Sequence, residues 1–370
     1  MTIILSTCGT SILTNDVDEA LRTMLTRHAN SAKEEAIRKE NPEEYQTIAA
    51  HIQDRKSQFR GYAPQKAAEK SAELNGILAY YEGRLPPGAN DVHYLLATDT
   101  WLGEATADIA RGWLETNGIK NCQVIRHPDL QTADWPLFRS SLSGLVKWCA
   151  ETIAPQRSPH CRVVFNLSGG FKSETGFLQT LGMFYADETI YMFERSGQLM
   201  RIPRLPARLE AKEDIEKDLA DFRRAALGLS VTAAKAGIYW FGMDGEFTLE
   251  PWGEMVFEEH KNAIYKEKIL PPPTDAIRFG LRFLDSCKNI SGKQRRQINR
   301  ALDLLAQCKE SPNHPNPNSL HYQPIRQPPS YAPDASHEIY AWNDGDARRI
   351  FCRELAGGVT ELICLGPHLR

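Results

Sequence analysis

The stretch Val163-Val164-Phe165-Asn166-Leu167-Ser168-Gly169-Gly170-Phe171-Lys172 decides the fold of the first half of the chain. Its three apolar residues predict a buried strand, and the glycine-bearing run after them predicts a tight turn into a helix. Paired glycines let backbone N–H groups approach an anion, Ser168 adds a hydroxyl, and Lys172 adds a positive charge. This pattern is typical of a loop that holds phosphate groups. The plainer interpretation is a tight turn followed by a solvated lysine.

Two common nucleotide-binding motifs do not fit this loop. A P-loop would require glycines where Asn166 and Phe171 stand, and the chain has no GxGxxG fingerprint. ATP hydrolysis and dinucleotide redox chemistry are therefore disfavoured.

Other short apolar runs extend the same pattern over residues 1–200. They occupy residues 3–5, 92–97, 122–125 and 189–193, and helical stretches separate them. This alternation predicts an α/β domain with a mostly parallel sheet and crossover helices. Residues 16–83 are rich in Ala, Glu, Lys and Gln, which predicts a helical insertion.

Polar residues follow three of these strands, and the carboxyl ends of parallel strands gather at one edge of a sheet. We therefore expect one ligand site there. Its expected residues are Thr10, Ser11, Asp99, Thr100, Asn166, Ser168, Gly169, Gly170, Phe171 and Lys172.

The bulk properties limit the class of protein. The 370 residues are 42% apolar and carry a formal net charge of -3, which favours two or three domains and disfavours general coating of nucleic acid. The eight cysteines include no CxxC pair and no zinc spacing, so we expect reduced core cysteines and no metal. No signal sequence and no run of 18 apolar residues is present, which predicts a soluble, cytoplasmic protein without a membrane partner.

The second half has a different pattern. Pro203 and Pro206 interrupt it, and a helix is expected over residues 212–226. We expect a helical connector over residues 201–273 that ends at the three prolines 271–273. Helices over residues 275–287 and 292–308, with Ser291 as N-cap, and strands over 336–342, 349–354 and 361–365 predict a small α+β domain with an antiparallel sheet over residues 274–370.

This last segment combines cations with aromatic rings and histidines. Such a surface suits RNA. Cleavage of RNA without a metal needs a base for the 2′-OH, cations for the phosphate and an acid for the leaving oxygen, and Arg, His and Tyr can divide those roles. The plainer interpretation is a solvated basic face. The cations, histidines and rings of this segment include Arg349, Arg353, His321, His368 and Tyr340.

The first half resembles a known family. Residues 8–15, 98–100 and 166–172 look like the CRISPR-associated sensor domains called CARF, and the resemblance covers about residues 1–200. It implies a Rossmann-like domain that binds cyclic oligoadenylate across a two-fold dimer interface. A homodimer presents each loop twice, which suits a ring such as cyclic tetra-adenylate.

The C-terminal segment resembles the RelE-type mRNA interferases, more by order of elements than by a fixed string. Carried over by position, Arg349 matches the family's transition-state arginine, His368 falls where one branch has a catalytic histidine, and His321 lies near another histidine of that branch. The resemblance therefore implies a catalytic set that consists of Arg349, His368, His321, Tyr340 and Arg353. Glu338 and Tyr340 stand where lysines are usual, so the general base stays open. The resemblance implies no catalytic cofactor.

These resemblances together predict an endoribonuclease of CRISPR antiviral defence. It would be metal-independent, activated by cyclic oligoadenylate, and would cut mRNA on the ribosome and arrest translation. The alternative is a DNA-binding transcription regulator that responds to the same ring. In that hypothesis residues 205–300 form a helix-turn-helix, and residues 293–300 lie on its recognition helix.

Overall fold

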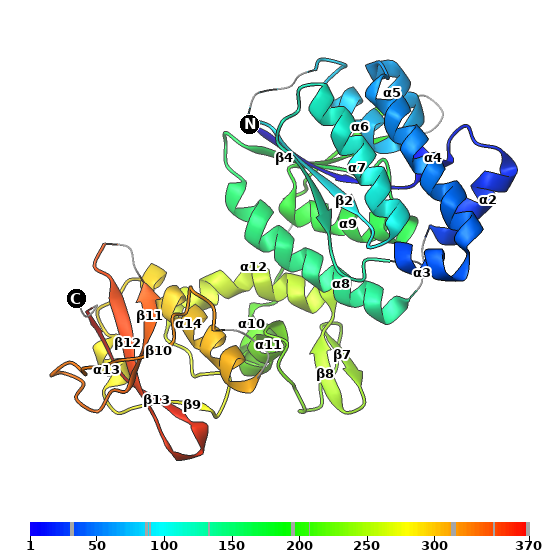
Figure 1. Cartoon of the computed structure of the whole chain (residues 1–370). Coiled ribbons are helices and arrows are strands. Elements are labelled where there is room, and N and C mark those ends of the chain that lie inside the picture. Colours follow the sequence, from blue (N-terminus) through cyan, green and yellow to red (C-terminus); the bar gives the residue numbers. More distant parts are fainter. Residues whose placement is uncertain are drawn as a thin grey trace. The chain divides into compact units, whose positions relative to one another are not determined.

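The chain folds into two compact units, Met1–Arg208 and Leu209–Arg370, in the computed structural model (Figure 1). The structure describes residues 1–29, 33–85, 88, 90–131, 134–193, 197–206, 208–311, 316–342 and 345–367. The expected connector, residues 201–273, is therefore divided between the units, and most of it packs with the C-terminal segment. No helix within these described ranges is long and apolar enough to cross a membrane.

The first unit is built on one twisted sheet with the strand order β3-β2-β1-β4-β5-β6. Its strands are β1 (Thr2–Thr7), β2 (Val92–Ala97), β3 (Cys122–Arg126), β4 (Arg162–Asn166), β5 (Glu188–Met192) and β6 (Leu199–Pro203). The first five run parallel, which confirms the predicted α/β sheet. The antiparallel edge strand β6 was not predicted, and Pro203 is tolerated there because it ends an edge strand.

Helices cover both faces of this sheet (Figure 1). They are α1 (Ser11–Thr14), α7 (Trp101–Thr116), α8 (Trp135–Trp148), which continues into the turns Cys149–Ile153 and Ala154–Gln156, and α9 (Lys172–Tyr185). Because side chains alternate along a strand, Ile4 and Leu95 enter one core, which they share with the insertion helices. On the other face Tyr94 packs its ring edge against Trp148 of α8.

The insertion is helical, as predicted. It consists of α2 (Glu19–His28), α3 (Glu34–Glu40), α4 (Pro42–Arg60), α5 (Pro64–Lys70) and α6 (Ala72–Tyr80). Ile48, Ile52 and Phe59 of α4 are buried against the same core as Trp113 of α7. The Trp113 indole also donates to the Tyr62 carbonyl at 3.0 Å. The insertion is therefore an integral part of the first unit.

The second unit combines helices with a five-stranded sheet and a separate hairpin. Its helices are α10 (Lys212–Lys217), α11 (Leu219–Ala226), α12 (Pro251–Glu267), α13 (Phe283–Ser286) and α14 (Gly292–Glu310). Its strands are β7 (Trp240–Met243) and β8 (Glu246–Leu249) in the hairpin, and β9 (Ile277–Phe279), β10 (Gln323–Pro324), β11 (His337–Trp342), β12 (Arg348–Glu354) and β13 (Thr360–Pro367) in the sheet, with a short turn at Ala356–Gly358. The sheet order is β10-β11-β12-β13-β9.

Three predicted strands and the helix α14 are confirmed here. The Ser291 hydroxyl accepts from Gln294 N at 3.3 Å, and the Gln294 side chain accepts from Ser291 N at 2.8 Å. This reciprocal cap fixes the start of α14, as the sequence predicted.

Other predictions for this unit are wrong. Residues 275–287 form β9 and the short helix α13, because Ile277 is buried while Arg278 turns outward to Glu361, and this period of two suits a strand. β9 pairs parallel to β13, so the sheet is not purely antiparallel. The expected helix over residues 212–226 is broken at Asp218, which is the cap between α10 and α11.

A buried ion pair joins three helices of the second unit. The Arg223 guanidinium of α11 donates to Asp303 of α14 at 2.8 Å, and both side chains are almost fully buried. The Tyr265 hydroxyl of α12 donates to the second oxygen of the same carboxylate. Burial and the neighbouring Asp303 charge raise the pKa of Tyr265 well above its usual value, so the phenol stays a donor. The segment before residue 273 is thereby fixed to the helix that follows it.

Candidate functional site

The sheet of the first unit reverses its winding between β1 and β4, and the loops after these strands meet there. Thr7 at the end of β1 donates its hydroxyl to the Gly169 carbonyl at 2.6 Å. A Cβ on Gly9 would lie 3.0 Å from the Gly170 nitrogen. Ligands of open α/β sheets bind at such a reversal, beyond the carboxyl ends of the strands. Two of the three predicted loops are therefore in contact at this edge.

Glycine is required at both positions of the Gly169-Gly170 pair. A Cβ on Gly169 would lie 2.6 Å from the Thr7 carbonyl oxygen, and Gly170 has a φ of +87° with Thr7 Cβ 2.9 Å from its own Cβ position. A side chain at either site would force the two loops apart. The close approach leaves a loop of backbone directly before the N-terminus of α9.

Asn166 supports the loop from inside the protein. Its amide group is fully buried and donates to Ser6 Oγ at 3.1 Å and to the Glu73 carbonyl at 2.9 Å. Its amide oxygen accepts from the Ser168 hydroxyl at 2.7 Å. Ser168 in turn accepts from Met192 N at 3.0 Å. Asn166 was expected to contact ligand, but its side chain is committed to shaping the loop.

Thr10 and Ser11 begin the short helix α1 on the other side of the reversal. The Ser11 hydroxyl donates to Glu73 Oε2 at 3.4 Å and accepts from Ala72 N at 3.2 Å. The first turn of α6 therefore lies against the loop after β1. Phe171 and Lys172 lead into α9, and the Lys172 side chain is exposed at its first position.

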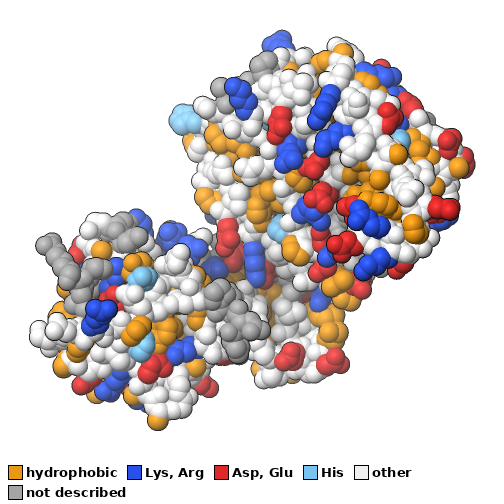
Figure 2. Space-filling view, in the orientation of Figure 1, with side chains coloured by type: hydrophobic (Ala, Val, Ile, Leu, Met, Phe, Trp, Pro, Cys, Tyr) orange, Lys and Arg blue, Asp and Glu red, His pale blue; other side chains and the backbone are white. Residues whose placement is uncertain are grey.

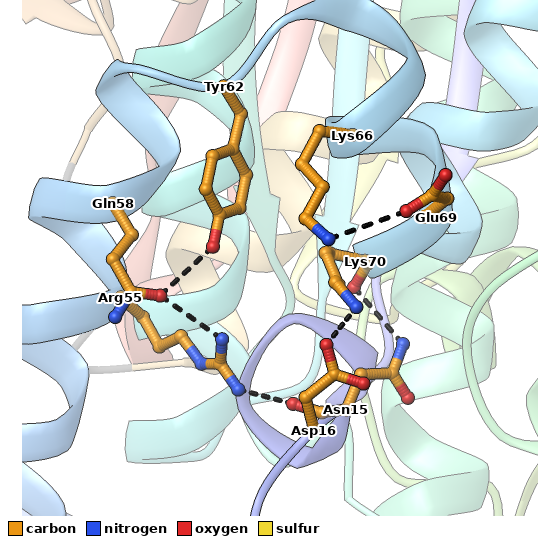
Figure 3. Close-up of polar contacts among 8 residues, drawn as sticks. All are labelled: Asn15, Asp16, Arg55, Gln58, Tyr62, Lys66, Glu69 and Lys70. Carbon is orange, nitrogen blue, oxygen red and sulfur yellow. Dashed lines mark hydrogen bonds and ion pairs between the residues drawn. The ribbon is translucent and has the colours of Figure 1, made fainter.

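The insertion also braces the end of α1 (Figure 3). Arg55 of α4 donates to the Asn15 carbonyl, Lys70 of α5 pairs with Asp16, and the Asn15 amide donates to the Lys70 carbonyl at 3.2 Å. Arg55 is held by Gln58, which also accepts from the Tyr62 hydroxyl. These contacts fix the segment that directly follows Thr10 and Ser11.

Asp99 and Thr100 lie after β2, one strand further from the reversal. Burial alone would raise the pKa of Asp99, but the Asp129 N–H at 3.0 Å and the Arg126 guanidinium at 2.6 Å hold it below its usual value. Thr100 is buried and caps α7 by accepting from Gly103 N at 3.1 Å. Asp99 thus keeps its charge, while the Thr100 side chain is used within the fold.

Two buried carboxyls that the sequence did not predict lie next to the glycine pair. Glu73 Oε2 and Glu174 Oε2 each lie 3.0 Å from the position of a Cβ on Gly169 and Gly170, respectively. Each side chain also has a buried Oε1 without a hydrogen-bond partner. Burial raises the pKa of Glu73 to about 7 and that of Glu174 to about 8. The position of Glu174, three residues after Phe171, weakly indicates a role in capping the helix that follows. Nothing in the sequence around Glu73 indicates a role at this site.

This arrangement can bind an anion. The loop Gly169-Gly170 and the start of α9 supply backbone N–H groups, and the exposed Lys172 supplies positive charge. Because its pKa is raised to about 8, Glu174 is mostly protonated near neutral pH, and Glu73, with a pKa of about 7, is partly protonated, so the two carboxyls repel an anion less than ionised carboxylates would.

The second unit brings three of the five expected catalytic residues together. The His321 and Tyr340 rings stack with centroids 4.5 Å apart, and the Arg349 guanidinium lies 3.7 Å from the Tyr340 ring centroid. Tyr340 and Arg349 are directly paired across β11 and β12. We call these three residues the stacked cluster. His321 has a φ of +49°, an uncommon conformation outside glycine.

Arg349 is only 3% exposed, beneath Tyr340. Burial lowers its pKa, although Tyr340 and Glu338 favour the charged form. Glu338 Oε1 lies 4.0 Å from Arg349 Nε, and both that Nε and Glu338 Oε2 are buried without a hydrogen-bond partner. Buried polar groups without hydrogen-bond partners lower stability, so the unpaired atoms of Arg349 and Glu338 indicate a functional role for this pair.

Of the other two expected catalytic residues, Arg353 does not join this cluster. Arg353 pairs with Glu361 at 2.7 Å and with Asp334 at 3.6 Å. His368 lies outside the described residues. Figure 2 shows basic and acidic side chains interspersed over the visible faces, in keeping with the small net charge.

Comparison with known proteins relates part of the chain to a family. No curated protein matches it. Residues 68–205 match the family model described as CRISPR-associated protein (Cas_APE2256). This stretch contains Glu73, the Asp99 loop and the whole loop from Asn166 to Lys172, but not Thr10 or Ser11. Over residues 68–205, which hold most of the candidate anion site, the chain is therefore similar to a CRISPR-associated protein family.

Proposed function

We propose that the protein is a mRNA endoribonuclease of CRISPR defence, that a cyclic oligoadenylate activates it, and that it cuts mRNA on the ribosome. The observation that carries this proposal is that the loops after β1 and β4 meet in an N–H-rich site, and that the β4 loop lies in the stretch similar to a CRISPR-associated family. The ring is the activating ligand, and the stacked cluster performs the cleavage.

The ligand site suits a cyclic oligonucleotide on grounds of symmetry. A homodimer would present the glycine loop, Ser11 and Lys172 twice around one axis. A ring of four adenylates has the same two-fold symmetry and carries one phosphate per nucleotide. Cyclic tetra-adenylate is therefore the ring that we propose first.

The stacked cluster suits cleavage without a metal. Arg349 would stabilise the phosphate, and Tyr340 and His321 offer a phenol and an imidazole for proton transfer or stacking. Glu338 is a further proton acceptor beside Arg349. Because Arg349 is covered by Tyr340, the Tyr340 ring must move before a phosphate can reach the guanidinium. This requirement suits an enzyme that is inactive until it is activated on the ribosome.

The test uses translating ribosomes with each cyclic oligoadenylate, followed by mapping of mRNA ends. We expect cleavage only with the matching ring. Arg349→Ala should abolish cleavage while ring binding is kept. Arg348→Ala is the matched control, because the neighbouring arginine pairs with exposed Asp346 outside the cluster. Uncut mRNA with every ring, or cleavage by Arg349→Ala, would contradict the proposal.

The alternative of a DNA-binding regulator draws on the basic start of α14, where Arg295, Arg296 and Arg300 lie. In that case Arg349→Ala should leave function unchanged, and double-stranded DNA of defined sequence should be bound.

A further inference from the structure

A pocket of about 400 Å³ opens between α14, β11 and the turn before His321. Its apolar lining includes Leu304 and Trp342, whose indole N–H donates to the Asp346 carbonyl at 2.6 Å. Its polar lining consists of Gln297, Arg300, Asn318 and Ser319. The size is in the range of small-ligand pockets and is sufficient for one nucleotide.

The chemistry of this lining is that of a nucleotide site. An apolar wall accepts the face of a base, and two amides and a hydroxyl can donate to and accept from its edges. Arg300 is exposed at the rim and can hold a phosphate. Gln297 Oε1 is a buried acceptor without a hydrogen-bond partner.

Positive charge on α14 is left unbalanced next to the pocket. Within the described residues, Arg295, Arg296 and Arg300 form no ion pair, and the Nε atoms of Arg295 and Arg296 have no hydrogen-bond partner. Other arginines of the unit are paired, such as Arg223 with Asp303 and Arg224 with Glu310. Arg296 and Arg300 are one helical turn apart, so they lie on neighbouring surface and can contact successive phosphates.

We propose that this pocket binds one nucleotide of single-stranded RNA, with its base against Trp342 and Leu304 and its phosphate on Arg300. The neighbouring phosphate would lie on Arg296. A single strand is required, because the base must leave its stack to enter the pocket. Tyr340 lines the pocket and also belongs to the stacked cluster, so the bound nucleotide flanks the one to be cut. The assignment of RNA as the ligand rests on the proposed ribonuclease function.

The test measures binding of a fluorescent eight-nucleotide RNA to the full-length protein by anisotropy. Its 2′ oxygens are methylated, so it cannot be cut and neither ring nor ribosome is needed. Arg300→Glu should weaken binding roughly ten-fold and lower the slope of log affinity against log salt by about 0.7. Ser319→Trp, a change at an exposed residue, should fill the pocket and weaken binding of the RNA to a similar extent.

Lys217→Glu is the matched control, because it makes the same change of charge at an exposed residue of α10. Its RNA affinity should equal that of the unchanged protein. Equal affinity of Arg300→Glu and Lys217→Glu would overturn the site. RNA binding that is weakened by Arg300→Glu but not by Ser319→Trp would show a basic surface without a nucleotide pocket. Equal affinity for a DNA duplex would show the same, and either result would overturn the nucleotide pocket. Pocket-dependent binding without any mRNA cleavage on ribosomes would refute the proposed function but not this site.

Discussion

Glu73 couples the stability of the first unit to pH. Its pKa is raised by burial from 4.5 to about 7, so folding retains a proton that the unfolded chain releases. This stabilisation is complete below pH 4.5 and is lost as the pH rises to 7. Glu73→Gln cannot ionise. Between pH 5 and pH 8 the unchanged protein should therefore lose about 2.5 kcal/mol more unfolding free energy than the variant, measured by urea denaturation.

The exposed Glu69 supplies the control for this experiment. Its carboxylate pairs with Lys66 one turn away on α5, and both side chains are solvated. Glu69→Gln should follow the pH dependence of the unchanged protein. A Glu73→Gln curve parallel to that of Glu69→Gln would mean that the buried carboxyl ionises freely.

The shape of the candidate anion site depends strongly on Gly170. Alanine there must adopt a φ near +87° and place its Cβ against Thr7, which should cost at least about 1 to 2 kcal/mol. Gly176 lies in the middle of α9 with open space around its Cβ position, so Gly176→Ala should stabilise by up to about 1 kcal/mol. Thermal unfolding measures both. Binding of cyclic tetra-adenylate should be lost only in Gly170→Ala.

At the scale of elements, the buried carboxylate of Asp303 connects α14 to α11 and α12. Asp303→Ala leaves the Arg223 guanidinium buried and uncompensated, so we expect a loss of about 3 to 5 kcal/mol in the second unit. Glu310→Ala breaks the partly exposed pair with Arg224 and should cost about 1 kcal/mol or less. Chemical denaturation of the two variants measures the difference. Similar losses would mean that Arg223 finds another partner.

Elements with a strong local pattern were predictable from the sequence, and those that depend on distant partners were not. The runs at 92–97 and 163–165 are buried parallel strands, and the Ser291 cap lies within four residues of its partner. β9 depends on pairing with β13, which lies far along the chain. The paired residues Arg278 and Glu361, for example, are 83 positions apart. The turn from β4 into α9 was predictable because its glycines are contiguous. Glu73 reaches that loop from α6, and nothing in its local sequence indicates this contact.

At the scale of the whole molecule, activation by cyclic oligoadenylate can be tested through thermodynamic linkage. The cyclic oligoadenylate and the mRNA-loaded ribosome must then affect each other's binding equally. If the ring strengthens binding of the protein to mRNA-loaded ribosomes by a given factor, the ribosomes must strengthen ring binding by the same factor. The variant Arg349→Ala is used for this test, because it should leave the mRNA on the ribosome uncut. The affinity for fluorescent cyclic tetra-adenylate, measured with and without ribosomes, should rise by the factor seen in ribosome pelleting with and without the ring. A typical coupling of 1 to 3 kcal/mol corresponds to about 5 to 150-fold. Lys172→Glu should weaken the binding of cyclic tetra-adenylate and, to a corresponding extent, reduce the increase in ribosome pelleting that the ring causes. The affinity for cyclic tetra-adenylate could instead be the same with and without ribosomes, while the unchanged protein still cuts mRNA only when the ring is present. The ring would then act on the rate of cleavage and not on ribosome binding.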